Sequence, residues 1–192
     1  MAKHLIPNLV LVLSVALCPS PTLSGTNDTP EAAVVSAFRD VCLEFADQPK
    51  KVAAAAKARN WALIGKESTK KLLRGAPGAA WLIIRKGEKN RIIFLYRLTG
   101  SCGIQHDNID PKAVMDIVRS ELKIQSFSPI KKKQNFEMAE FRVDHQGLLA
   151  GLLRTTSNFS SERLSGSLNF VSVAALKAGK ARVTLQKLEN SN

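Results

Sequence analysis

Cysteine, histidine and aspartate come close together at one place in the chain, at Cys102, His106 and Asp107. A thiol near an imidazole and a carboxylate is the composition of a cysteine hydrolase site, in which the histidine activates the thiolate. No nucleophile signature surrounds these residues, and pairing of Cys102 in a disulfide would remove the thiol. The pattern therefore favours a bridged cysteine and a histidine in a loop. The alternative is a small envelope hydrolase with a site near His106 or His145.

The histidines and nearby carboxylates are also candidate metal ligands. The set would be His106, Asp107, Asp110 and His145, but no ligand spacing such as His-x3-His supports it. The chain further lacks a phosphate-binding loop, a nucleotide-binding glycine pattern and a Gly-x-Ser-x-Gly elbow. We therefore expect no metal, no cofactor and no catalytic residue, and a protein that is not an enzyme.

Basic residues offer a different chemistry, because 28 lysines and arginines against 16 acidic residues give a formal net charge of +12. Two clusters are candidates for anion binding: Arg85, Lys86, Lys89 and Arg91, and the run Lys131, Lys132 and Lys133. If the fold brings the clusters together, they form an anion-binding face. Each cluster by itself can also serve only to keep a turn or an edge strand soluble.

The charge predicts an anionic envelope component or an acidic protein as the partner. Specific binding of nucleic acid is disfavoured, because one Tyr and two Trp are too few to stack successive bases.

The first 25 residues have the layout of a secretory signal peptide. Lys3 precedes an apolar stretch at 5–18, and small, turn-prone residues follow at 19–25. A membrane-spanning helix needs about 20 apolar residues, and this stretch is shorter and is interrupted by Pro7. We expect cleavage near residue 25, no transmembrane span in the mature chain, and a periplasmic or secreted location.

Export changes the meaning of the three cysteines, Cys18, Cys42 and Cys102. Cys18 would leave with the signal, although a lipoprotein site there is an alternative that Leu17 disfavours. The two remaining thiols, in an oxidising compartment, are most simply read as one disulfide. Two separately buried thiols are the other reading that the residues allow.

Three helices are predicted to position these groups. Thr29-Pro30 is a cap and a first-turn proline, and apolar residues then recur at Val34, Phe38, Val41 and Phe45 on one helix face with Cys42 beside them. The alanine-rich segment 50–59 is a second helix that Trp61 ends. Asp110-Pro111 begins a third, with an apolar face at 114–122. Residues 66–78 are too interrupted by glycine and proline to assign.

Strands are predicted for most of the remainder. Residues 81–84 and 91–98 form a hairpin, with the second strand continuing to 102–104, and residues 139–143 alternate between apolar and polar. Further strands are expected at 148–156, 164–173 and 182–188. The whole predicts a single α+β domain over 26–192, in which a mostly antiparallel sheet packs with about three helices and one disulfide.

Several of these features together carry a resemblance: Phe38-x3-Cys42, the alanine-rich helix ending in Trp61, the hairpin running into Cys102-Gly103-Ile104, and Asp110-x2-Ala113-Val114. This part of the chain, residues 34–122, resembles a type of small secreted or periplasmic protein of Gram-negative proteobacteria whose function is uncharacterised. The resemblance implies an exported domain with paired cysteines, and it supplies no catalytic residues. We expect an exported, non-enzymatic protein of the bacterial envelope or extracellular space that binds an anionic partner. A secreted host-interaction factor is a further alternative.

Overall fold

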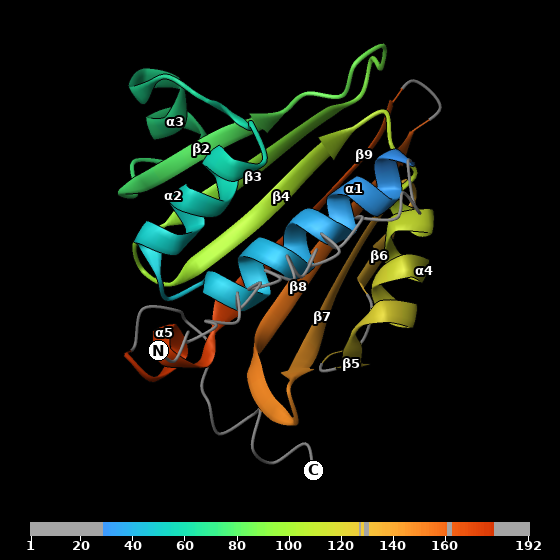
Figure 1. Ribbon diagram of the computed structural model, residues 1–192. Helices are drawn as coiled ribbons and strands as arrows, with labels where there is room; N and C mark the ends of the chain where they lie inside the picture. The colour runs from blue at the N-terminus through green and yellow to red at the C-terminus, as the bar shows by residue number, and fades with distance from the viewer. Residues whose placement is uncertain (1–28, 127, 129–130, 161–162, 179–192) are drawn as a thin grey trace, which may run out of the picture.

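The computed structural model describes residues 29–126, 128, 131–160 and 163–178 (Figure 1). The expected signal peptide at 1–25, including Cys18, and the expected strand at 182–188 lie outside the described residues. No helix of the described part of the chain is long and apolar enough to cross a membrane.

A nine-stranded antiparallel sheet forms the body of the protein. Its strands are β1 (Ala62–Leu63), β2 (Gly78–Ile83), β3 (Arg91–Arg97), β4 (Ser101–Asp107), β5 (Lys123–Ser126), β6 (Lys131–Lys133), β7 (Phe136–His145), β8 (Leu148–Ser160) and β9 (Arg163–Ser172). They are ordered β1-β2-β3-β4-β9-β8-β7-β5, and β6 also pairs with β7. The predicted α+β fold with a mostly antiparallel sheet is therefore confirmed.

The helices are α1 (Pro30–Ala37), which continues as a π-helical segment η1 (Phe38–Leu43), α2 (Pro49–Ala58), α3 (Lys66–Leu72), α4 (Pro111–Glu121) and α5 (Val173–Lys177). Figure 1 shows α1 and η1 crossing the middle strands of the sheet, with α2 on one side and α4 on the other. The two predicted cap-and-proline starts are confirmed. Thr29 Oγ1 accepts a hydrogen bond from the Ala32 amide at 3.2 Å, and Asp110 Oδ1 accepts one from the Lys112 amide at 2.8 Å.

The main core lies between these helices and one face of the sheet. Phe38 and Val41 of the first helix are fully buried, as are Phe94 of β3 and Ile104 of β4. The rings of Phe38 and Phe170 meet edge to face, with centroids 6.0 Å apart. The helix face predicted from the apolar spacing is therefore the face that is buried.

The disulfide between Cys42 and Cys102 is confirmed, with 5.8 Å between the two Cα atoms. Cys42 belongs to η1 and Cys102 to β4, one of the middle strands. The bridge therefore links the helix covalently to a central strand of the sheet.

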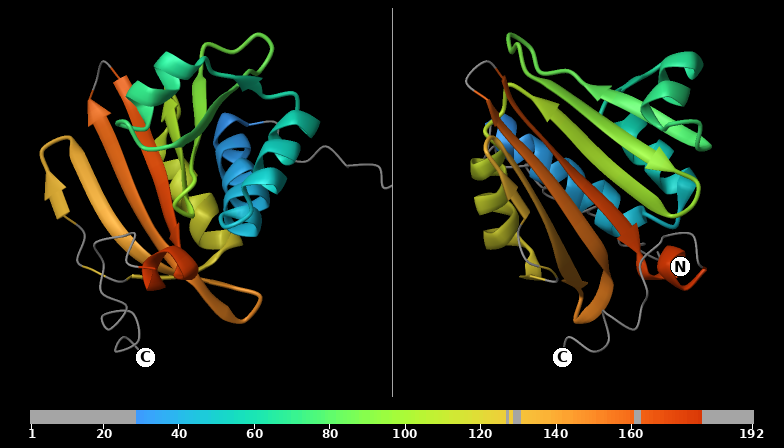
Figure 2. Two further views of the ribbon diagram at one scale, coloured as in Figure 1. Left: turned by 90° about the vertical axis from the view of Figure 1, so that its left-hand side faces the viewer. Right: turned by 180° about the vertical axis from the view of Figure 1, so that it is seen from behind.

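The other face of the sheet is covered in two places: α3 packs on β2, and α5 packs on β8 and β9, where Leu152 is buried. Leu73, which caps α3, packs on β2 and β3 with Ala80, Ile93 and Leu95 in a second, smaller core. Seen from behind in Figure 2, strands β4, β9, β8 and β7 have no described helix in front of them over most of their length, and α5 lies at the end of β9. We call this surface of β3, β4, β9, β8, β7 and β6, opposite α1, the open face.

The predicted strand running from residue 91 to residue 104 is wrong, because it is two strands joined by a tight turn. Gly100 has a φ of +79°, a backbone conformation that residues with a side chain rarely adopt. Its amide donates to the Arg97 carbonyl at 3.2 Å. The chain therefore reverses, and β4 returns antiparallel to β3. As a consequence, His106 lies in a strand and is buried, and the prediction of a loop histidine is also wrong.

Candidate binding face at one end of the sheet

The open face is polar because of how the strands alternate. Residues that pair across an antiparallel sheet point to the same side, and successive residues point to opposite sides. The partners of Gln105 in β4 are Ile93 in β3 and Ser167 in β9, and Ser167 in turn pairs with Thr156 in β8. Cys102, Ile104 and His106 point to the helix side. Gln105 and its partners on the adjacent strands therefore point to the opposite side.

A row of residues crosses this face at one end of the sheet. From β6 to β3 the pairing runs Lys133, Phe136, Asn158, Ser165, Asp107, Arg91. We call these six residues the end row. They cross five strand spacings of about 4.8 Å, or about 24 Å along the sheet.

A cavity of about 360 Å³ lies on the open face along the end row. Its lining is Arg91, Ile93, Gln105, His106, Asp107, Phe136, Thr156, Ser157, Asn158, Ser165, Gly166 and Ser167. Hydroxyl and amide side chains make up half of the set, and it also holds one charged pair and the ring of Phe136, which is 40% exposed.

Some of the polar groups of the open face already bond to one another. Thr156 Oγ1 and Ser167 Oγ are 2.8 Å apart, and Asn169 Nδ2 donates to Ser167 Oγ at 2.8 Å. The side chains of Gln105 and Ser165 make no hydrogen bond to another described residue. Both therefore have hydrogen-bonding capacity that solvent or a ligand can use.

The run Lys131–Lys133 is a short strand, and its three side chains divide between the two faces of the sheet. Lys131 pairs with Met138 and Lys133 with Phe136 of the end row, so both project from the open face. Lys132 projects to the helix side, where its Nζ lies 2.8 Å from Glu137 Oε1. The structure therefore brings two of the three predicted lysines to the cavity's side of the sheet.

The hairpin cluster is also divided. Arg85 is half-buried and forms an ion pair with Glu88 at 2.9 Å, whereas Lys86 and Lys89 are exposed in the turn before β3. Arg91 Nε donates to Asp107 Oδ2 at 2.8 Å, and its side chain remains 57% exposed at the cavity. Arg91 and Lys133 thus stand at the two ends of the end row.

His106 lies beneath the cavity with 2% of its surface exposed, and its Nδ1 has no hydrogen-bond partner. Burial lowers the pKa of His106 to about 4, although the carboxylates of Asp107, Glu31 and Asp110 oppose this effect. The ring fits because Gly166 has no side chain, and a Cβ there would lie 2.6 Å from His106 Nε2. The imidazole is therefore neutral at pH 7.

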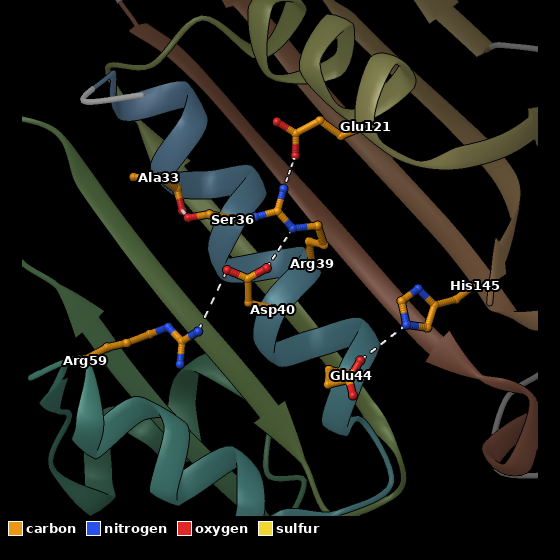
Figure 3. A network of polar contacts seen from close by, with 8 residues as sticks. All are labelled: Ala33, Ser36, Arg39, Asp40, Glu44, Arg59, Glu121 and His145. Atoms are coloured by element: carbon orange, nitrogen blue, oxygen red, sulfur yellow. Dashed lines mark hydrogen bonds and ion pairs between the residues drawn. The ribbon is translucent and has the colours of Figure 1, made fainter. Parts of the chain in front are cut away.

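His145 lies at the opposite end of the sheet, in the last position of β7. Its Nε2 is 3.3 Å from Glu44 Oε2, as Figure 3 shows. On the helix that carries Glu44, Arg39 Nε donates to Asp40 Oδ1 at 2.7 Å, and Arg39 Nη1 donates to Glu121 of α4. These contacts join the helix to α4 and β7. His145 and His106 lie at opposite ends of the sheet and do not share a site.

The cysteine hydrolase alternative requires a free thiol at Cys102, but Cys102 is bonded to Cys42. Among the described residues, no group of three or more His, Cys, Asp and Glu side chains could hold a metal ion. No protein-family model, curated protein or solved structure matches the chain.

The polar lining of the cavity was missed by the sequence reasoning. A signal was present in β9, where Ser165, Ser167 and Asn169 alternate with Leu168 and Phe170. Residues 154–158 of β8 are polar at every position and show no alternation. Alternation marks two faces of a strand, but it does not show which face a helix will cover.

Proposed function

We propose that the protein is an exported, non-enzymatic binding protein of the bacterial envelope or extracellular space, and that it holds an anionic partner on the open face. The observation that supports this proposal is the end row, which places Lys133 at one end of a polar cavity and the paired Arg91 and Asp107 at the other. Lys131 adds a second positive charge beside Lys133. Export is supported by the disulfide, since such bonds persist in oxidising compartments.

The hydrolase alternative gains no support from a shared site, because His106 and His145 lie at opposite ends of the sheet and Cys102 is bridged. Export itself is tested by the mass of protein recovered from outside the cytoplasm, where a chain beginning near residue 25 is expected. An intact Met1 would contradict export.

The binding test compares two double variants with the same loss of charge. Lys131→Gln/Lys133→Gln removes both lysines of the open face, and Lys50→Gln/Lys57→Gln removes two exposed lysines of α2 as the control. Binding to phosphatidylglycerol vesicles and to dextran sulfate is measured at low salt. A lysine near an anionic surface contributes about 1 kcal/mol, so the open-face variant should bind about thirtyfold more weakly.

Both interactions should also weaken as salt rises, because exposed charges are screened beyond about 8 Å at physiological ionic strength. Absence of binding to both probes at low salt would contradict the proposal. Equal losses in the two double variants would do so as well, since net charge alone would then explain the attraction.

A further inference from the structure

The chemistry of the open face identifies the kind of anion that fits it. We infer that the cavity along the end row binds an acidic polysaccharide, a chain of sugars carrying carboxylate or sulfate groups. This inference rests on the proposed function, because it names the partner that the open face would hold.

Hydrogen-bonding capacity is the first argument. Gln105 and Ser165 make no side-chain hydrogen bond to a described residue, and Asn158 keeps its amide nitrogen after its Oδ1 accepts from the Ser160 amide at 3.2 Å. An amide both donates and accepts, and a serine hydroxyl does the same. Sugar hydroxyls also donate and accept, so they complement such a lining, whereas a carboxylate or phosphate only accepts.

The distribution of charge is the second argument. Arg91 and Lys133 stand at the two ends of the end row, about 24 Å apart along the sheet, with uncharged Asn158 and Ser165 between them. Arg91 donates to Asp107, so these two charges offset each other and the net positive charge of the end row lies at Lys133. A partner that fits this pattern is an extended chain that carries an acidic group toward Lys133 and neutral polar groups along the rest of the row.

Phe136 supplies the third argument. Its ring is 40% exposed in the lining of a cavity that is otherwise largely polar. A flat ring at such a position can pack against the C–H groups on the face of a sugar. An acyl chain would require a continuous apolar lining, and here Ile93 is the only other large apolar side chain among the lining residues.

The test uses three probes: polygalacturonate, which is an acidic sugar chain, poly-glutamate, which is acidic without sugar, and dextran, which is sugar without charge. Polygalacturonate should bind more tightly than poly-glutamate at equal salt, and dextran should bind far more weakly than either. Gln105→Leu and Phe136→Ala should each weaken polygalacturonate binding about three- to tenfold, the range expected for loss of one hydrogen bond or one packing contact. Neither variant should alter poly-glutamate binding.

Gln125→Leu is the matched control, because Gln125 is an exposed strand glutamine on β5, outside the cavity. Thermal unfolding of each variant separates a lost contact from a lost fold. Equal binding of polygalacturonate and poly-glutamate, or no effect of Gln105→Leu and Phe136→Ala, would overturn the polysaccharide inference and leave the anionic partner standing. Tighter binding of phosphatidylglycerol vesicles than of polygalacturonate would identify a membrane surface instead. If none of the anionic probes binds, the proposed function fails as well.

Discussion

Removing the bridge between Cys42 and Cys102 should cost the protein much of its stability. The two cysteines are separated by 60 positions in the chain. In the chain-entropy model, opening a loop of that size lowers the free energy of unfolding by about 4 kcal/mol. For a domain of this size, about 1 kcal/mol corresponds to about 2–4 °C in melting temperature, so the expected loss is about 8–16 °C.

Alanine is the better replacement, because both cysteines are at most 1% exposed. A serine there would place a hydroxyl away from water, which costs a further 1–3 kcal/mol or so and would confuse the comparison. The variants are Cys42→Ala, Cys102→Ala and the double substitution, measured by thermal unfolding with and without a reductant.

The three variants should melt within a few degrees of one another, since the bridge can be lost only once. Reductant should lower the melting temperature of the unsubstituted protein toward theirs and leave the double variant unchanged. If the single losses add up in the double variant, or if reductant leaves the unsubstituted protein unaffected, the bridge does not provide this stability.

Two further predictions concern the buried histidine. Gly166→Ala should lower the free energy of unfolding by about 1–3 kcal/mol in a urea titration, because the new Cβ would lie 2.6 Å from His106 Nε2 and 2.9 Å from the Thr156 carbonyl oxygen. Gly65→Ala, where no atom lies within 4 Å of the added Cβ, is the control, and an equal loss there would refute the steric reasoning. The free energy of unfolding should also fall in acid. In the folded protein the pKa of His106 is about 4, whereas in the unfolded chain it is about 6.5. The unfolded chain therefore binds the proton first, and about 3 kcal/mol of the stability present above pH 6.5 is lost as the pH falls to 4. In His106→Phe the same titration should be shallower by about that amount, and an unchanged pH profile would contradict the buried neutral imidazole.

Local patterns predicted the elements whose signals are local. The cap at Thr29 and the proline that follows begin a helix wherever the rest of the chain lies, and the alternation at Ala139, Phe141 and Val143 marks one buried strand face in any sheet. The disulfide was also accessible, because the expected removal of Cys18 with a signal peptide leaves two cysteines and therefore one pairing.

Elements that depend on distant partners were not predicted. The helix at 66–72 is short and carries four lysines and glutamates among its seven residues, and it is held largely by Leu73 packing onto β2 and β3. Arg91 and Lys133 of the candidate site were named from the sequence, but its polar residues were missed for the same reason, because the end row combines side chains from β3, β4, β6, β7, β8 and β9. Their register sets which of them meet, and a single strand's sequence does not contain that register.

The pairing at the centre of the sheet also bears on the order in which the strands can assemble. Strand β4 can form a hairpin with β3 at once, but its other neighbour is β9, the last strand of the described chain. Until β9 arrives, β4 has an unpaired edge, and Phe38 lacks Phe170 as its packing partner. Unpaired edges promote aggregation, and pairing between distant segments is slow.

Cys42 and Cys102 both precede β9 in the chain, so the bridge can close while the sheet is still incomplete. A bridge closed at that stage would hold the first helix beside β4, close to the edge that β9 later fills. The disulfide would then help to shield the unpaired edge of β4 during folding, a role separate from its contribution to the stability of the folded protein.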